Sequence, residues 1–338
     1  MFARWKTYLS GFSRPLSGQL VIWILIYISI TQTSWVLSAA PTDRNVPVTA
    51  LSFLPEQILA SRSLLLVCRL GLLVGGGLWG LQLVLPVSCW LSVGCMTAVV
   101  AMSYENSTHI SHVYHLTNMV LLIHALWYQF HYREIRVALL KGVFWQSPLY
   151  PNWTFMLSVF CIALFHTYAG LSKLVVSGPE WANGVSLQLW VHLWGRDDSF
   201  VNELIVSNRQ AAIALQVATL VIETTAIAAV FSRWFRFAIG VGLLGLYYGI
   251  VESFGFYFKY NAFLVAAFFL PCDQLLDSLS VFLRRRIRIP LTLSGSRFGR
   301  RLVKAVVSRV DMFGLIELRE SGTPVVTDEI ERGGVNNP

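Results

Sequence analysis

The sequence predicts an all-α integral membrane protein, a polytopic helical bundle of about eight transmembrane helices. Composition supports this fold class: of 338 residues, 55% are hydrophobic and only 13% are charged, with a mean hydropathy of +0.59. This is about half the share of charged residues found in soluble domains. So few polar side chains would not cover the surface of a soluble globule of this length.

The second observation is that apolar windows long enough to cross a bilayer recur along the chain. They lie at 17–39, 63–85, 87–104, 112–130, 153–176, 211–231, 236–254 and 260–282. Prolines separate some of these windows, as Pro86 does between the second and the third and Pro151 does before the fifth. No early cleavage site follows the first window, so we expect it to remain as a membrane anchor.

The third observation is the distribution of basic residues. Three of them precede the first window, and basic clusters at 131–141, 233–236 and 284–288 fall on the same side when eight spans are counted. The positive-inside rule assigns this side to the cytoplasm, so both termini are expected there. The net charge of +8 then reflects these flanks, and no nucleic-acid partner is expected.

We therefore expect three regions along the chain. They are a cytoplasmic segment over 1–16, a transmembrane domain over 17–283, and a basic then acidic, loosely ordered cytoplasmic tail over 284–338. The run from Arg133 to Val143 is predicted to form an amphipathic helix on the inner surface. The five cysteines are odd in number and lack metal-ligand spacing, so we interpret them as small buried hydrophobes.

Lys173 lies inside the fifth predicted span, about one helical turn from its outer end. A charged residue within a span indicates either a functional side chain or a lysine whose ammonium reaches the headgroups. His166, Gly170 and Lys173 share one stripe of the helix. Gly170 would let another helix or a flat ligand approach the backbone there. Desolvation favours the neutral amine, so Lys173 can act as a proton acceptor.

Three histidines, His109, His112 and His115, cluster at the outer end of the fourth predicted span. One of them can donate a hydrogen bond to a developing oxyanion. The alternative is that they meet water and lipid headgroups at the interface. No carboxylate accompanies the cluster, so a metal site is the weaker interpretation and no metal is expected.

Two acidic residues are candidate partners for these groups. Glu223, near the middle of the sixth predicted span, must be protonated or paired, and we expect a structural pair at a depth well below Lys173. Glu252 is nearer to Lys173 in depth and is the better predicted partner and catalytic candidate. Trp181 belongs either to an interfacial aromatic belt or to the wall around a flat apolar ligand.

At these residues the chain resembles the horizontally transferred transmembrane (HTTM) family, which is related to the membrane domain of vitamin K-dependent gamma-carboxylases. The resemblance covers roughly residues 10–285. An acidic residue about fifty positions after the lysine resembles Glu223, and an upstream Asn-x-His-x-Tyr element resembles residues 106–114. The family's lysine motif, followed by a tryptophan and a glycine, is similar to Ala169, Gly170, Lys173, Leu174, Trp181 and Gly184.

The resemblance implies an activity. In the carboxylases the matching lysine deprotonates vitamin K hydroquinone, and the matching histidine helps to hold the oxygen-bearing intermediate. By resemblance Lys173 is the base and His112 the oxyanion partner, with His115 matching if no gap is allowed. A reduced, vitamin K-like quinone is the implied cofactor. Its candidate binding residues are His109, His166, Gly170 and Trp181.

The implied enzyme is a carboxylase-like or epoxidase-like lyase or oxidoreductase. It would work at the outer face of a bacterial cytoplasmic membrane as a multi-pass protein, in contact with lipid, on a secreted peptide or protein. Two features depart from the carboxylases: their lumenal domain has no counterpart, and a histidine of their seventh span is replaced by Tyr248. The alternative is a non-catalytic partner or carrier in peptide maturation or in lipid or peptide export.

Overall fold

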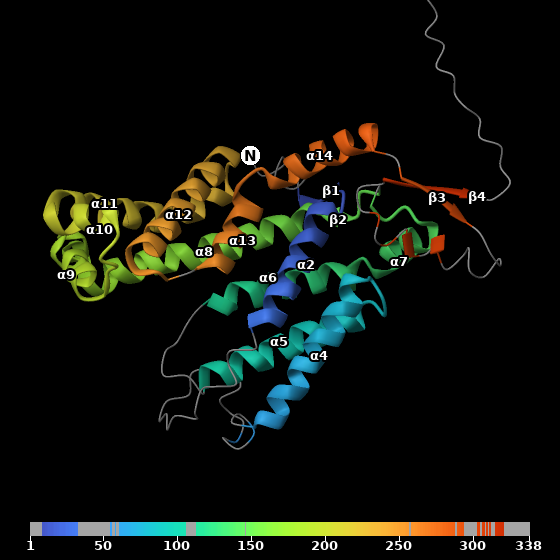
Figure 1. The fold of residues 1–338 in the computed structure, drawn as a ribbon, viewed down its shortest axis with the longest axis horizontal. Helices are drawn as coiled ribbons and strands as arrows, with labels where there is room; N and C mark the ends of the chain where they lie inside the picture. Colours follow the sequence, from blue (N-terminus) through green and yellow to red (C-terminus); the bar gives the residue numbers. More distant parts are fainter. Residues whose placement is uncertain are drawn as a thin grey trace, which may run out of the picture.

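Helices make up most of the described chain, as the sequence predicts, and Figure 1 shows how the computed structural model arranges them. The structure describes residues 9–32, 55, 58, 61–105, 113–145, 147–256, 258–287, 289–293, 303–304, 306–307, 309, 311 and 315–320. The first four predicted windows overlap α2 (Leu16–Gln32), α4 (Arg62–Gly80), α5 (Val87–Glu105) and α6 (Val113–Phe130), which begin within one residue of the predicted starts.

α4 and α5 pack closely because glycines on α4 admit side chains of α5. A Cβ added to Gly71 would lie 2.5 Å from Cys95 Sγ, and one added to Gly75 would lie 2.9 Å from Ser92 Oγ. Small residues at such contacts are typical of helix pairs in membranes. The start of α4 is capped by Ser61, whose hydroxyl accepts the backbone N–H of Leu64.

After α6 the chain forms the predicted amphipathic helix as α7 (Tyr132–Lys141), which buries Ile135 and Leu139. Gly142, with a φ of +71°, ends α7 in the left-handed conformation. The chain then enters β2 (Tyr150–Pro151), which pairs antiparallel with β1 (Phe12–Ser13). This pairing joins the start of the described chain to the segment that precedes the fifth predicted span.

The longest helix of the described chain is α8 (Asn152–Ser177), which runs between two groups of helices (Figure 1). A 3-10 helix, η2 (Gly178–Ala182), continues directly from its end. The next elements gather around the C-terminal half of α8. They are α9 (Val185–Trp194), α10 (Phe200–Ser207), α11 (Arg209–Thr224), η3 (Ala226–Val230) and α12 (Arg233–Phe254).

The sixth and eighth predicted spans are broken. Within the sixth span, 211–231, α11 ends at Thr224 and the chain continues as η3. The first turn of η3 is held by Thr167, whose Oγ1 accepts the N–H of Ile227 at 3.0 Å. Before this span, α11 is bent by 111° from α10. The eighth span becomes α13 (Lys259–Phe269) and α14 (Cys272–Arg286), separated by a bend next to Pro271. Proline disrupts helices because it lacks an N–H and clashes with the preceding turn.

Within the described residues, three helices are long and apolar enough to cross a membrane, or up to five if each bent pair counts as one span. The three are Arg62–Gly80, Asn152–Ala182 and Arg233–Phe254. α2 has 17 residues, and the apolar part of α5 is also too short for this test. The α-helical class is therefore confirmed, whereas the count of eight spans is not and stays a prediction.

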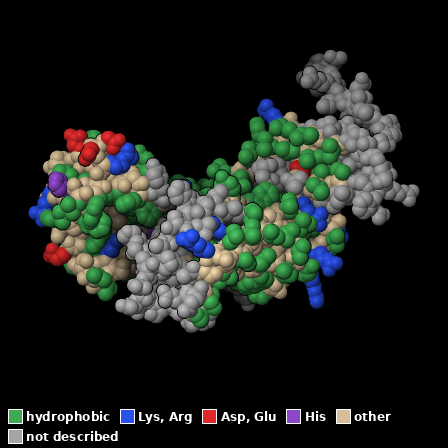
Figure 2. Space-filling model, turned by 60° about the horizontal axis from the view of Figure 1, so that its bottom comes forward, with side chains coloured by type: hydrophobic (Ala, Val, Ile, Leu, Met, Phe, Trp, Pro, Cys, Tyr) green, Lys and Arg blue, Asp and Glu red, His purple; other side chains and the backbone are tan. Residues whose placement is uncertain are grey.

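Hydrophobic side chains cover much of the face shown in Figure 2, and charged side chains gather mainly at its two ends. The core lies where α2, α4, α5, α6, α8 and α13 meet, and it contains the fully buried Trp79, Trp127 and Phe268. His124 is also buried there, with Nε2 3.1 Å from the Tyr150 hydroxyl. This histidine is a packed and hydrogen-bonded core residue.

Two short strands lie beyond α14, and the loose order expected of the tail over 284–338 stays a prediction. β3 (Ile289–Leu293) pairs in parallel with β4 (Ile316–Glu320) over five residues of each strand. Apolar residues alternate along β3 with the period of a β-strand, and Ile289 and Leu291 are exposed.

Candidate functional site

Lys173 lies on α8, about nine residues before the end of the continuous α8–η2 helix at Ala182, or roughly 14 Å at the helical rise. Its amine forms an ion pair and a hydrogen bond with the carboxylate of Glu223, near the end of α11. The two side chains are 27% and 8% exposed, respectively. Lys173 is therefore partly buried, and its acidic partner is buried.

This partner differs from the predicted one, Glu252. The prediction is wrong because it treated the fifth and sixth spans as straight helices whose outer ends lie at the same depth in the membrane. The chain instead continues through η2 to Gly184, which packs against Arg209 at the start of α11. Lys173 thus lies deeper than expected and level with Glu223. Glu252 is half-buried on α12, and it forms no ion pair with a residue that the structure describes.

Gly170 makes the room for this contact. A Cβ added there would lie 2.7 Å from the backbone nitrogen of Thr224 and 2.8 Å from Glu223 Cβ. Because one neighbour is backbone, α11 could not lie this close to α8 if any other residue occupied the position. The prediction that Gly170 lets a second helix approach beside the lysine is confirmed, and that helix is α11.

The turn after α8 places Trp181 against the lysine. Lys173 Nζ lies 5.2 Å from the centre of the Trp181 ring, within the range of a cation–π contact. Gln216, buried on α11, holds this turn: its Nε2 donates to the Trp181 carbonyl at 2.7 Å and to Ser186 Oγ at 2.9 Å. Its Oε1 accepts the Gly184 N–H at 2.8 Å, and Gly184 has a φ of +82°, which favours glycine.

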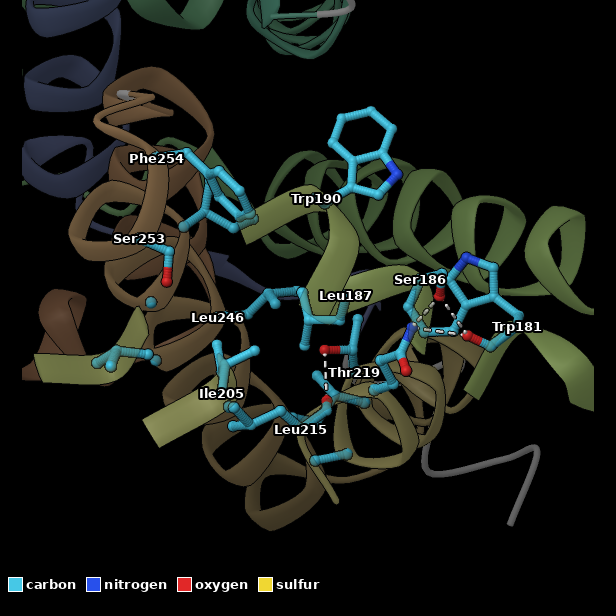
Figure 3. A pocket seen from close by; sticks show the side chains of 18 of the residues that line it. Trp181, Ser186, Leu187, Trp190, Ile205, Leu215, Thr219, Leu246, Ser253 and Phe254 are labelled. Atoms are coloured by element: carbon cyan, nitrogen blue, oxygen red, sulfur yellow. Dashed lines mark hydrogen bonds between the residues drawn. The ribbon is translucent and has the colours of Figure 1, made fainter. Parts of the chain in front are cut away.

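A cavity of about 660 Å³ opens beside this turn, between α9, α10, α11 and α12 (Figure 3). Apolar side chains such as Leu187, Ile205 and Leu246 form most of its lining, and Ser186 and Thr219 add hydroxyls. Its size is that of a typical small-molecule site, about 300–1,000 Å³.

Two features of the cavity wall bear on the lysine and on the space available. Trp181 lines the cavity, and its ring also contacts the Lys173 amine. The ring therefore lies between the cavity and the ion pair. On the opposite side, Gly245 and Gly249 of α12 have no atom within 4 Å of an added Cβ. Bare helical backbone therefore forms part of the lining and leaves room for a ligand to lie against it.

Hydrogen bonds also join the elements that surround the cavity. Asn202 Nδ2 donates to the carbonyls of Arg196 at 2.9 Å and Ser253 at 2.8 Å, which joins the start of α10 to the end of α12. Arg196 also makes two hydrogen bonds to the carboxylate of Asp198, at 3.1 and 2.9 Å. These bonds, and then the guanidinium charge, lower the pKa of Asp198, which is exposed outside the long apolar helices.

His166 faces away from the cavity, although it shares the predicted stripe with Gly170 and Lys173. It is 4% exposed, and its Nε2 lies 2.9 Å from the hydroxyl of Tyr247 on α12. The structure therefore places His166 in a buried hydrogen bond and not in the cavity lining. Its predicted role in binding a cofactor stays a prediction.

Two of the three histidines of the cluster lie outside the residues that the structure describes. His109 and His112 lie outside the described residues. His115 stands near the start of α6 with an exposed side chain, and it does not line the cavity. The oxyanion role assigned to His112 by resemblance thus remains a prediction.

Two residues of the site were missed from the sequence. Gln216 precedes Glu223 by seven positions, so both lie on one stripe of α11, and polar residues with this spacing in an apolar helix could have indicated a shared face. Tyr247 is 7% exposed whereas its neighbour Tyr248, the residue considered by resemblance, is 69% exposed. No local pattern distinguishes these two adjacent tyrosines.

Comparison with known proteins finds no matching family model, no similar curated protein and no similar solved structure. The resemblance drawn from the lysine motif therefore stands on the sequence alone.

Proposed function

We propose that this chain is a membrane enzyme of the HTTM type that uses Lys173 to remove a proton from a reduced, quinone-like cosubstrate bound in the neighbouring cavity. The observation that carries the proposal is the placement of the Lys173–Glu223 pair directly behind Trp181, which lines that cavity. An apolar pocket with a few polar groups and a neighbouring ionisable pair is the usual setting of a binding or active site.

The residues around the cavity fit such a cosubstrate. Its apolar lining and the bare backbone at Gly245 and Gly249 suit a flat, oily molecule. Ser186 and Thr219 offer hydroxyls for the polar edge of a ring. Trp181 can stack on a ring or turn aside to open a path to the lysine. This fit supports a reduced quinone better than it supports a charged or strongly polar substrate.

The pair itself explains how a lysine can accept a proton. The Lys173 amine donates a hydrogen bond to the Glu223 carboxylate, so a proton can pass from the amine to the carboxylate within the pair. Trp181 excludes water on the cavity side and also favours an ammonium once the proton has arrived. A reduced quinone would supply two hydroxyl protons and, with molecular oxygen, the chemistry that forms an epoxide and one water.

We place the protein in a bacterial cytoplasmic membrane as a multi-pass protein with about eight spans and cytoplasmic termini. The three to five helices that are long and apolar enough support membrane insertion, and the basic clusters support the orientation. In this orientation the cavity faces the outer side, so a secreted peptide or protein is the proposed final substrate.

The test is epoxide formation by purified protein in lipid nanodiscs supplied with reduced vitamin K and oxygen. Lys173→Met keeps the length of the side chain and should reduce the product to background. Lys259→Met, which changes an exposed lysine on α13, is the matched control and should retain activity. Absence of epoxide with the unmodified protein, or unchanged formation by Lys173→Met, overturns the proposal.

A second candidate function is a non-catalytic partner or carrier, and the ion pair between α8 and α11 is the observation that favours it. In this case Lys173 and Glu223 only join two helices, and apolar residues of similar size can replace both. The double variant Lys173→Met/Glu223→Leu separates the two functions. A folded double variant that retains full function supports the carrier, whereas a folded but inactive one supports the base.

A further inference from the structure

Helix α7 presents two different faces. One face is buried in the core through Ile135, Ala138 and Leu139. The opposite face carries two large apolar side chains, although Val137 is 49% exposed and Leu140 is 74% exposed. A surface helix of a soluble protein carries polar residues on the face that points away from the core. The exposed face of α7 therefore has the composition of a surface that contacts something other than water alone.

Basic residues surround this apolar pair. By helical spacing, Arg133 lies between Leu140 and Val137 on the exposed face. Arg136 lies at one edge of this face and Lys141 at the other, and all three basic side chains are exposed. An apolar centre flanked by cations is typical of helices that lie in the headgroup region of a bilayer. In such helices the apolar side chains enter the acyl boundary while the cations stay among the headgroups.

The position of α7 in the chain fits this setting. Only His131 separates α7 from α6, the fourth predicted span, and Phe130 at the end of α6 is 68% exposed. At the other end of α7, Gly142 donates its N–H to the Leu139 carbonyl at 3.2 Å, and the chain continues into the buried Phe144. Both ends of α7 are therefore fixed, so its exposed face has a defined direction.

A segment far away in the sequence lies beside the start of α7. The ring of Phe12 in β1 meets the His131 imidazole edge-on, at 5.4 Å between ring centres, and β1 is held by its pairing with β2. Phe12 is 47% exposed, and Arg14, two residues later, is also exposed. On the face shown in Figure 2, Lys and Arg side chains stand among hydrophobic ones at the end of the molecule opposite to α9 and α10. We call this surface the α7 patch, and it consists of Phe12, Arg14, Phe130, Arg133, Arg136, Val137, Leu140 and Lys141.

We infer that the α7 patch binds the phosphate groups of anionic phospholipids in the membrane that holds the chain. This inference goes beyond the proposed function and does not depend on the chemistry at Lys173. The patch carries cations from two segments, whereas α7 has a single acidic residue, Glu134, which lies beside Lys141 at the edge. An anionic headgroup brings a phosphate without a cation of its own, so it complements this charge better than a zwitterionic headgroup does.

The side chains of the patch also favour a lipid over a soluble anion. The guanidinium groups of Arg133 and Arg136 can each hold two oxygens of one phosphate. Val137 and Leu140 gain nothing from a soluble anion, but they are removed from water when lipid tails cover them. Only a molecule with a phosphate and an apolar part uses both features of the patch.

The test is native mass spectrometry of the detergent-solubilised full chain, titrated with phosphatidylglycerol or with phosphatidylcholine. The tightest site should prefer phosphatidylglycerol. Arg133→Gln/Arg136→Gln should weaken phosphatidylglycerol binding by about 25-fold, at about fivefold for each cation near a lipid surface, and should leave phosphatidylcholine binding unchanged. Arg62→Gln/Lys259→Gln removes two exposed cations outside the patch, so it is the matched control and should retain the preference.

A variant with the opposite expected sign guards against a loss caused by misfolding. Glu134→Gln removes the negative charge beside the patch and should strengthen phosphatidylglycerol binding by about fivefold. Equal affinities for the two lipids, equal losses in the two double variants, or an unchanged affinity in Glu134→Gln overturn the inference. A short polyglutamate peptide stands for an acidic soluble partner, and tighter binding of this peptide than of phosphatidylglycerol also overturns it. If Arg133→Gln/Arg136→Gln does not fold, the result for Glu134→Gln decides.

Discussion

Replacement of Gly170 by alanine tests the contact that brings Glu223 to Lys173. The added methyl group would meet the backbone nitrogen of Thr224 at 2.7 Å and the Cβ of Glu223 at 2.8 Å. A backbone atom cannot move aside by a side-chain rotation. Helix α11 must therefore move away from α8, and the ion pair must lengthen or break.

The size of the effect follows from two opposing contributions. Alanine is favoured over glycine inside a helix by about 0.5–1 kcal/mol, and overpacking at a tight contact costs about 1–3 kcal/mol. Gly94→Ala on α5 is the matched control, because no atom lies within 4 Å of its added Cβ and only the favourable contribution applies. Relative to this control, Gly170→Ala should lower the free energy of unfolding by about 1–3 kcal/mol.

The measurement is reversible denaturation of both variants in the same mixed micelles, followed by tryptophan fluorescence and by circular dichroism. The two probes should report the same order of stability. Equal free energies of unfolding for Gly170→Ala and Gly94→Ala would refute the close approach of α11 to α8. The position of Glu223 beside Lys173 would then need another explanation.

Three further predictions concern the pair, the cavity and the turn after α9. Glu223→Ala should destabilise the protein by roughly 1–3 kcal/mol in denaturant titrations, less than for a fully buried pair because Lys173 is 27% exposed; a stability equal to wild type would contradict a pair inside the bundle. Gly249→Leu should fill the cavity and weaken binding of an apolar fluorescent ligand with little change in unfolding, and unchanged binding would show that the ligand does not use this wall. The pKa of Asp198 is lowered in the folded protein. Its contact with Arg196 should therefore be present at a pH above the ordinary aspartate pKa, about 3.9. The contact should be lost as the pH falls through the lowered pKa of the folded state. Amide exchange around this turn should follow that course and should no longer depend on acid in Asp198→Asn.

Much of the architecture could be predicted because it depends on local chemistry. Apolar windows of the right length become helices wherever they occur, and α4, α5, α6, α8 and α12 lie within a few residues of their predicted bounds. Gly170 was identified because a glycine beside a lysine on one helical stripe has few uses other than close approach. The breaks in the sixth and eighth spans were missed, since a hydropathy window does not sense where a helix bends.

The partner of Lys173 could not be predicted in the same way. Its identity depends on the relative heights of α8 and α11, which are set by how η2 and the Gly184 turn extend the chain beyond α8. The same holds for Tyr247, whose burial is decided by the rotation of α12 against α8. A shift of one residue in that rotation would bury Tyr248 instead.

The sequence by itself determined that this protein is a helical chain suited to a membrane and that it carries one conspicuous lysine beside a glycine. These features follow from the hydropathy and spacing of neighbouring residues, which act over one or two helical turns. Only the tertiary structure decided that Glu223 meets this lysine, that His166 binds Tyr247, and that Trp181 both lines a cavity and contacts the lysine. Those contacts join residues 50 to 81 positions apart, so they depend on how whole helices pack and not on any local pattern.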